Sequence, residues 1–425
     1  MEILARFVSE HINDDTSKLI LNKSKWPHID MELAVNSIES RRKLKGKVPE
    51  WCDIPTLIFP AKLSAEQCSS SPTGRYKARF AESIASVTNK DNTGWKIADL
   101  TGGLGVDSWF FARKASSVLY NEMQEKLCVA AAHNFKKLGV ENIIISNNCA
   151  EKGRIAQILK DFNPDIVYMD PARRGEGGKK VFLIEECTPD VLKIRDEIFT
   201  YTRNILLKLS PMADISMVCE RLGRNCREVH VVASAGECKE LLIWMDAEWD
   251  DDYTVRPVEI IGERYCSAFS FRMSDEKSSS MTMFDAGLHI GEENKTGSVY
   301  LFEPGKSLMK SGAFNLISCR FGISKLGVST HYYITEDLAL AEQLCDYGKV
   351  YKIARVHNLD KRGIKAAAMV FPKADVTARN VPMDTETLRK KLGVLSGEHA
   401  HIFGLKSDRL GNLLLCTERV LKQNL

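Results

Sequence analysis

Short apolar runs alternate with longer amphipathic segments between about residues 95 and 250. The runs have the length of buried strands, and the segments between them have the apolar spacing of helices. The predicted strands are 95–100, 117–121, 142–146, 166–170 and 204–209. The predicted helices are 106–114, 125–137, 151–161, 189–201 and 213–222. This alternation predicts an α/β fold with a mainly parallel, doubly wound sheet and covering helices.

The segments on either side of this pattern differ from it. Residues 1–90 have mostly helical spacing, with a helix expected at 76–87, so we predict a helical N-terminal region. Two strands at 228–233 and 241–245 follow one another with a short link, which predicts an antiparallel hairpin. A plain nucleotide-binding fold has no such hairpin at this point.

A polar, serine-rich stretch at 273–280 predicts a domain boundary. Beyond it the pattern mixes both element types, with a helix expected at 338–345. The strands expected there are 298–302, 331–334, 349–356, 399–405 and 413–417. We therefore divide the chain into a helical region 1–90, an α/β domain 91–273, and smaller α+β parts 281–328 and 329–425.

Composition excludes several classes of protein. Of the 425 residues, 44% are apolar and 27% charged, as in soluble globular proteins. The net charge of +3 gives no global basic field, so any nucleic-acid binding must come from local patches. The 12 cysteines lack C-x-x-C spacing, and His399 and His401 have no carboxylate partner that we identify, so we expect no metal. Without a secretory signal or a membrane-length apolar run, we expect a cytoplasmic protein with free thiols.

A glycine-rich turn follows the first predicted strand of the α/β domain. Its glycines let the backbone approach a ligand closely, and the helix after it aims an N-terminus at the same place. The residues of this turn that we expect to bind a cofactor are Asp99, Thr101, Gly102, Gly103, Gly105 and Asp107.

Two further side chains at strand ends point to the kind of cofactor. Glu122 can accept hydrogen bonds from both hydroxyls of a ribose, and Asn148 can face an adenine edge. A dinucleotide site needs G-x-G-x-x-G, and Ser108 stands at the last position. An acidic residue before the glycines suits a positively charged ligand better than a pyrophosphate. These features favour S-adenosylmethionine, and a dinucleotide or a ligand-free turn are the alternatives.

These motifs resemble those of class I S-adenosylmethionine-dependent methyltransferases over roughly residues 70–270. The resemblance rests on the glycine turn, on Glu122 and on the loop Asp170–Pro171–Ala172–Arg173. The late hairpin is similar to the reversed last strand of that fold. The resemblance implies a Rossmann-like, seven-stranded sheet with S-adenosylmethionine as cofactor.

Two other segments resemble one bacterial group of methyltransferases. Residues 66–78 are similar to the segment before its sheet, and the chain from about 330 is similar to its C-terminal THUMP-like domain. The piece at about 280–325 resembles a small ferredoxin-like module. THUMP domains accompany RNA-modifying enzymes, so the resemblance implies RNA, ribosomal or transfer, as substrate.

Asp170 ends a predicted strand at the position that lies beside the transferred methyl group in methyltransferases. It could accept a hydrogen bond from the acceptor, act as a general base or anchor the substrate. No aromatic residue follows it, unlike in many amino-group methyltransferases. The loop resembles that of the RNA uridine-C5 methyltransferases, but the later strand that supplies their cysteine reads Leu207–Pro211 here, without one. We assign Asp170 and Arg173 to catalysis and leave the acceptor atom open.

Several basic residues are candidates for binding substrate phosphates. Lys208 either pairs with Asp170 or faces solvent. The candidate substrate-binding residues are Arg75, Tyr76, Lys77, Arg173, Arg174 and Lys208. The basic run 41–47 and a group on the C-terminal part (Arg355, Lys361, Arg362 and Lys365) are either RNA contacts or solvated surface.

The predicted function is that of an S-adenosylmethionine-dependent methyltransferase that acts on RNA. One alternative is a methyltransferase for a protein or small molecule. The other is a non-catalytic RNA-binding protein with a vestigial cofactor pocket. The sequence does not predict the modified nucleotide or the oligomeric state.

Overall fold

A computed structural model describes residues 1–88, 94–173, 184–284, 298–397 and 399–421. The chain forms two compact units, which are described separately. The first unit comprises Met1–Ser234 and Lys239–Thr254, and the second comprises Ala235–Cys238 and Val255–Leu425. The units divide near Thr254, upstream of the polar stretch predicted as a boundary, and that stretch contains the helix α12 (Met273–Ser278).

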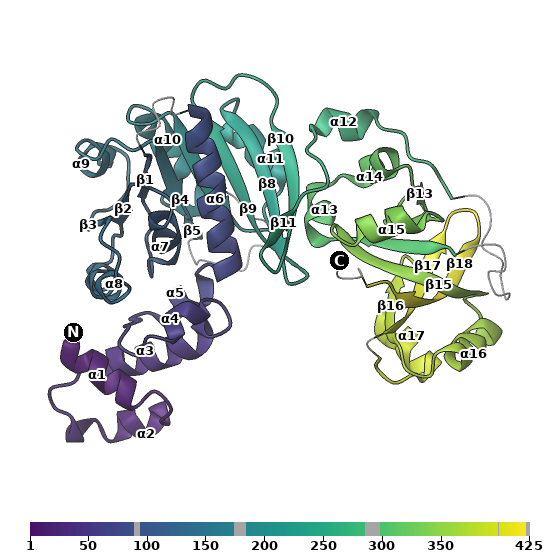
Figure 1. Ribbon diagram of the computed structural model, residues 1–425, viewed down its shortest axis with the longest axis horizontal. Helices are drawn as coiled ribbons and strands as arrows, with labels where there is room; N and C mark the ends of the chain where they lie inside the picture. The colour runs from purple at the N-terminus through teal and green to yellow at the C-terminus, as the bar shows by residue number, and fades with distance from the viewer. Residues whose placement is uncertain (89–93, 174–183, 285–297, 398, 422–425) are drawn as a thin grey trace. The chain divides into compact units, whose positions relative to one another are not determined.

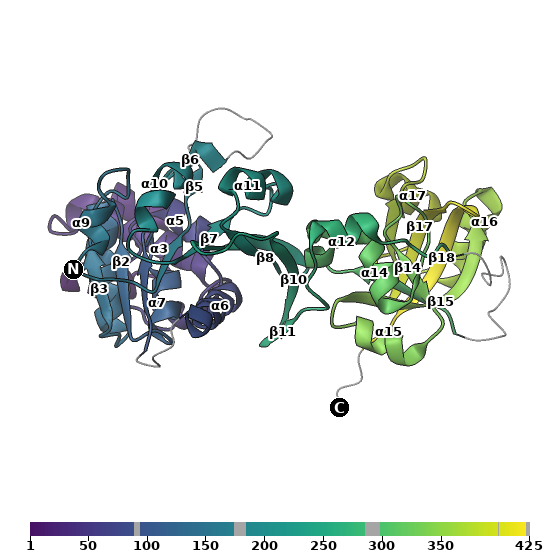
Figure 2. The same cartoon turned by 90° about the horizontal axis from the view of Figure 1, so that it is seen from above.

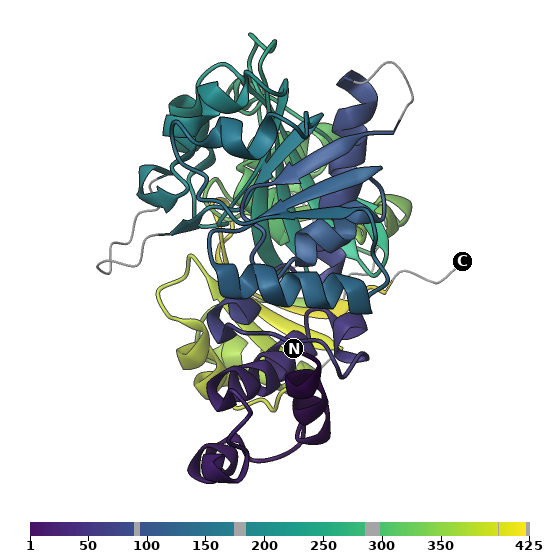
Figure 3. The same cartoon turned by 90° about the vertical axis from the view of Figure 1, so that its left-hand side faces the viewer.

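The first unit begins with the predicted helical region. Its helices are α1 (Glu2–Glu10), α2 (Thr16–Leu21), α3 (Met31–Leu44), α4 (Pro49–Cys52), α5 (Lys62–Gln67) and α6 (Ser71–Thr88). The apolar faces of α1 and α3 pack together and against Ala130 of α8 (Glu125–Lys137). The purple N-terminal helices accordingly lie together beside α8 (Figures 1 and 3).

One residue of the basic run 41–47 explains why this region folds as it does. Arg41 is 4% exposed, and its guanidinium donates to five backbone carbonyls between Trp51 and Leu57. Lys47 Nζ donates to the carbonyls of Glu66 and Cys68. Neither alternative for the basic run, an RNA contact or a solvated surface, holds for Arg41, because its guanidinium is buried against the carbonyls of an irregular segment.

A parallel-rich sheet forms the centre of the first unit (Figure 1). Seven of its strands lie in the order β8-β9-β7-β4-β1-β2-β3. They are β1 (Lys96–Asp99), β2 (Ser117–Asn121), β3 (Ile143–Ser146), β4 (Ile166–Met169), β7 (Asn204–Leu209), β8 (Cys226–Ser234) and β9 (Glu237–Asp246). The strands from β3 to β7 are parallel, and β9 is antiparallel to β7. The predicted α/β sheet with a late hairpin is confirmed.

Helices cover both faces of this sheet, so β1, β4 and β7 are buried along nearly their whole length. α6 packs against α7 (Val106–Ala112) and against β4 and β8, and α7 packs against β2. On the opposite face lie α10 (Val191–Ile198) and α11 (Ile215–Leu222) (Figure 2). α9 (Ile155–Leu159) packs against α10. The carboxyl ends of β1, β2 and β4 therefore meet at one edge, with helix N-termini beside them.

The second unit contains a seven-stranded sheet in the order β13-β14-β12-β15-β18-β17-β16. Its strands are β12 (Tyr300–Pro304), β13 (Ser324–Lys325), β14 (Tyr333–Thr335), β15 (Gly348–Asn358), β16 (Asp375–Arg379), β17 (Ala400–Ser407) and β18 (Gly411–Arg419). Its helices after α12 are α13 (Lys306–Ser311), α14 (Phe314–Phe321), α15 (Leu338–Leu344), α16 (Lys361–Val370) and α17 (Thr385–Leu392). β10 (Thr254–Ile261) and β11 (Arg264–Cys266) form an antiparallel pair. Among the residues that the structure describes, no helix has the length and apolar character needed to span a membrane.

Candidate functional site

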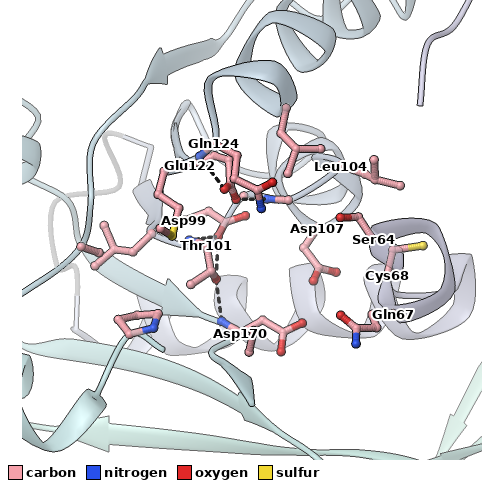
Figure 4. A pocket seen from close by; sticks show the side chains of 18 of the residues that line it. Ser64, Gln67, Cys68, Asp99, Thr101, Leu104, Asp107, Glu122, Gln124 and Asp170 are labelled. Carbon is pink, nitrogen blue, oxygen red and sulfur yellow. Dashed lines mark hydrogen bonds between the residues drawn. The ribbon is translucent and has the colours of Figure 1, made fainter. Parts of the chain in front are cut away.

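A cavity of about 310 Å³ opens at the carboxyl ends of β1, β2 and β4 (Figure 4). That volume is at the lower end of the roughly 300–1,000 Å³ of small-molecule sites. The cavity is lined by Asp99, Glu122, Asn148 and Asp170 from the strand ends, and by Cys68 and its neighbours after α5. The sheet thus brings Asp170 and the predicted cofactor residues other than Gly105 into one site. Gly105 packs against the ring of Phe135 instead.

The glycine turn owes its shape to two features of its backbone. Gly103 and Gly105 have φ values of +53° and +87°, which L-residues with side chains rarely adopt. Gly102 lies on the ring of Tyr120, and a Cβ atom there would be 2.2 Å from Tyr120 Cε2. The Tyr120 hydroxyl donates to the carbonyl of Gly103 at 2.6 Å. The turn therefore lies flat on β2 and exposes its backbone to the cavity.

Asp99 holds this turn to the helix that follows it. Its Oδ1 accepts from the backbone N–H of Thr101 at 3.0 Å, and its Oδ2 accepts from the Ser108 hydroxyl at 2.7 Å. The side chain is almost fully buried, and this burial raises the pKa of Asp99 to about 7. A positively charged ligand nearby would favour the ionised form of this carboxyl.

Glu122 and Asn148 line the cavity where the sequence predicted a nucleoside. The two carboxylate oxygens of Glu122 accept from the backbone N–H groups of Gly103 and Gln124 at 3.0 and 2.9 Å. Each oxygen keeps a further lone pair, so the fixed carboxylate can still accept from a ligand's hydroxyls. The side-chain amide of Asn148 donates to Ser146 Oγ at 2.8 Å. The arrangement fits an adenosine group with a positively charged substituent.

Asp170 lies across the cavity from Glu122 and is fixed from two sides. Its backbone N–H donates to the Thr101 hydroxyl at 2.7 Å, and Lys208 Nζ donates to its Oδ2, also at 2.7 Å. Of the two alternatives for Lys208, the structure shows the pairing with Asp170. Asp170 lines the cavity with its side chain 29% exposed, whereas Lys208, which is not one of the lining residues, is 17% exposed.

A buried charged cluster lies next to this pair. Lys77 Nζ contacts Asp107 Oδ1 at 2.9 Å and Glu240 Oε2 at 3.3 Å, and its side chain has no exposed surface. Asp107 also accepts from the hydroxyls of Ser69 and Tyr168. Against the effect of burial, Asp107 and Glu240 raise the pKa of Lys77, so it stays an ammonium ion. Burial likewise raises the pKa of Glu240.

The predicted substrate contacts around Lys77 need correction. Lys77 is enclosed by the cluster just described, and Tyr76 is 6% exposed with its hydroxyl 2.8 Å from His230 Nδ1. Neither presents its polar group to the cavity, because both lie on the face of α6 that packs on the sheet. Arg75 is more exposed and forms an ion pair with Glu50.

The loop after Asp170 is described only in part. The backbone of Arg173 pairs with Cys187 in a two-stranded ladder of β5 (Ala172–Arg173) and β6 (Cys187–Thr188). Arg174 lies outside the described residues. Within the described ranges, no group of His, Cys, Asp and Glu side chains could hold a metal ion. His401 instead contacts the Thr377 hydroxyl at 2.8 Å and stacks on Phe403.

Sequence reasoning missed Glu240 and Cys68. Glu240 immediately precedes the apolar run of β9 and is buried. An acidic residue is unexpected at such a place, so its position next to the apolar run could have marked it as a candidate site residue. Cys68 follows α5, and nothing in its local sequence marks it as a lining residue.

Comparisons with known proteins agree with this architecture. Family models match residues 300–340 as a ferredoxin-like domain and residues 348–419 as a THUMP domain-like family. A crystal structure from Porphyromonas gingivalis W83, described as that of a candidate methyltransferase, has 28% sequence identity and a TM-score of 0.82. The alignment covers 99% of this chain and 98% of that one. The chain therefore has the fold of that protein over its whole length.

A more distant structure is M. capricolum TrmK in complex with S-adenosyl-homocysteine. It has 14% identity and a TM-score of 0.29, and the alignment covers 40% of this chain and 70% of that one. No curated protein matches the sequence.

Proposed function

We propose that this protein transfers a methyl group from S-adenosylmethionine to RNA, ribosomal or transfer. The observation that carries the proposal is the single cavity that joins the glycine turn and Glu122 to Asp170. In this proposal the edge formed by the glycine turn and Glu122 holds the nucleoside of the cofactor, and the Asp170 carboxylate on the far side of the cavity lies beside the acceptor. The whole-length likeness to the Porphyromonas gingivalis protein supports it.

Each predicted cofactor residue has a specific part in this proposal. Glu122 would accept hydrogen bonds from the ribose hydroxyls, and Asn148 would lie at the adenine. Gly103 would bring the backbone close to the ligand, and Gly105, which packs against the Phe135 ring, would keep the turn in shape. The cofactor supplies an electrophilic methyl group on a sulfonium ion.

Three further residues shape the end of the cavity that holds the charged part of the cofactor. Asp99 and Thr101 keep the glycine turn in place through the hydrogen bonds described above. Asp107 lines the cavity and adds negative charge beside Asp170. These charges favour a cationic ligand over a pyrophosphate.

Asp170 would work next to the transferred methyl group. Methyl transfer is an in-line displacement, so its main requirement is that acceptor, methyl and sulfur are aligned. The hydrogen bonds to Thr101 and Lys208 fix the Asp170 carboxylate in advance of substrate binding. Arg173, three residues further on, would bind a phosphate of the substrate.

RNA as the substrate is supported by the second unit. Its match to a THUMP domain-like family covers residues 348–419. Within it, α16 and α17 border a cavity of about 710 Å³ that is lined by Lys361, Lys365 and Lys391 and by exposed Met369. Lysine side chains along such a groove can neutralise backbone phosphates. All twelve cysteines are free thiols, which suits the reducing cytoplasm where such RNA is modified.

Transfer of labelled methyl from S-adenosylmethionine to RNA that lacks this protein's modification tests the proposal. The wild-type protein is expected to label RNA, and Asp170→Ala is expected to bind S-adenosylhomocysteine but transfer no label. Absence of labelled RNA from a wild-type protein that binds the cofactor would refute RNA as the substrate. Failure to bind the cofactor would refute the methyltransferase itself.

A further inference from the structure

Five charged side chains of alternating sign lead from the core of the first unit to the cavity. Asp107 contacts Lys77 at 2.9 Å, Lys77 contacts Glu240 at 3.3 Å, and Lys208 contacts Asp170 at 2.7 Å. The two halves of the array lie side by side, because Lys208 is opposite Leu242 in the β7–β9 ladder and Glu240 lies two residues before Leu242, on the same face of β9. In agreement with this placement, Glu240 and Asp170 both raise the pKa of Lys208 against the opposing effect of burial. The array draws on α6, α7, β7, β9 and the end of β4.

We propose that the methyl acceptor is a hydroxyl oxygen, which on RNA is the ribose 2′-hydroxyl. In this proposal Asp170 and Lys208 contact the hydroxyl, and Lys77 and Glu240 are positioning residues that act through Lys208. The inference rests on the proposed function and names the acceptor that the function leaves open.

The reaction at a hydroxyl balances with the groups present. The hydroxyl oxygen forms a bond to the methyl carbon, and the bond from that carbon to sulfur breaks with its electron pair left on sulfur. The hydroxyl proton passes to the Asp170 carboxylate and from there to water. Lys208 cannot take this proton, because its raised pKa keeps it protonated.

A lysine ammonium at this place favours oxygen over nitrogen as the acceptor. A hydroxyl is a weak nucleophile until it begins to lose its proton, and an adjacent cation stabilises the negative charge that then develops on oxygen. An amine nitrogen gains positive charge as the methyl arrives, so the same cation would oppose its reaction. The described lining of the cavity also includes no aromatic ring on which a flipped base could stack.

Methylation of a ring carbon would need a cysteine thiolate as nucleophile. Two cysteines line the cavity, but neither is expected to be a thiolate. Burial raises the pKa of Cys68 to about 11, and burial also raises the pKa of Cys149. Both thiols therefore keep their protons at neutral pH, and the thiolate is the nucleophilic form.

The buried part of the array has features that a purely structural ion pair does not need. Glu240 is 2% exposed, and its Oε1 has no hydrogen-bond partner among the described residues. A buried carboxylate with a free oxygen is costly, because burial removes its hydration without replacing it. When all five groups are ionised, three carboxylates and two ammonium ions leave the array with one surplus negative charge beside the place where a cationic methyl donor would bind.

Alkaline digestion of the labelled RNA tests the inference on the full-length protein. Alkali cleaves RNA at each free 2′-hydroxyl, so a methylated ribose leaves the label in alkali-resistant dinucleotides, which is the expected result. Label in mononucleotides would place the methyl on a base, and would overturn this inference while the proposed function stands. No label in RNA, from protein that binds S-adenosylhomocysteine, would overturn RNA as the substrate and the ribose assignment with it.

Variants with a pH readout test the positioning role. Glu240→Gln is expected to move the alkaline limb of the kcat profile to lower pH by about one unit or more, because Lys208 loses a neighbouring negative charge. Asp246→Asn is the matched control, since Asp246 is a buried carboxylate on the same strand that pairs with Arg203 and Arg227 instead. This control is expected to keep the wild-type profile. An unchanged profile for Glu240→Gln would overturn the positioning role of Glu240.

Discussion

The buried lysine of α6 offers a direct test of the charged cluster. In Lys77→Met the stem of the side chain is kept and the ammonium is lost, so Asp107 and Glu240 lose the cation that compensates them. Breaking a buried ion pair by removing one partner costs about 3–5 kcal/mol, because a charge remains buried and unpaired. We expect Lys77→Met to lower the free energy of unfolding of the first unit by this amount.

The expected change is large enough to measure by thermal unfolding. For a unit of roughly 250 residues, each kcal/mol lowers Tm by about 2–4 °C, so Lys77→Met should lower it by about 6–20 °C. Adding Asp107→Asn to Lys77→Met removes one of the unpaired carboxylates. The double variant should therefore be less destabilised than the sum of the two single variants, with a coupling of about 1–3 kcal/mol.

Lys62→Met is the matched control for this measurement. Lys62 makes an ion pair of 2.7 Å with Glu39, but its side chain is 47% exposed. An exposed pair contributes only about 0–1 kcal/mol, so this variant should unfold within a few degrees of the wild type. Calorimetry and circular dichroism of five proteins give the comparison: the wild type, Lys77→Met, Asp107→Asn, the double variant and Lys62→Met. A Tm for Lys77→Met as high as that of Lys62→Met would refute the view that Lys77 is a buried, paired charge.

Two other predictions concern the glycine turn and Asp99, which precedes it. Gly102→Ala would place a Cβ atom 2.2 Å from the Tyr120 ring. We therefore expect the variant to lose about 1–3 kcal/mol of stability. We also expect its affinity for S-adenosylhomocysteine, measured by calorimetry, to fall at least about tenfold. Gly46→Ala, where nothing lies within 4 Å, should change neither, and equal affinities would contradict the prediction. For Asp99, whose pKa burial raises to about 7, the folded state retains a proton that the unfolded chain releases above about pH 4. Its stabilising effect is complete below that pH and is lost as pH rises through 7, so urea unfolding should show wild type losing about 2–3 kcal/mol more than Asp99→Asn between pH 5 and 8. Parallel pH curves for the two proteins would show that Asp99 is not the group that titrates.

The sequence predicted the parts of the molecule that depend on local patterns. Apolar residues fill β4 and the centres of β1 and β2, and glycines follow β1, so both the strands and the ligand turn could be predicted. The buried contact between Lys77 and Glu240 could not be predicted, because the two residues are far apart in the sequence and meet only through the order of the strands. The spacing of apolar residues also could not show that Arg41 is buried, because its burial depends on an irregular segment that begins ten residues later.

The pairing of β12 with β15 affects how the C-terminal part of this chain can be handled. The ferredoxin-like match ends at residue 340 and the THUMP-like match begins at residue 348, yet β12 and β15 are adjacent strands of one sheet. A fragment that starts at residue 348 would leave β15 with an unpaired edge of apolar strand, which invites aggregation. A fragment made to express the THUMP-like part alone, or to fuse it to another protein, should therefore begin before β12, because the two matched regions share one sheet.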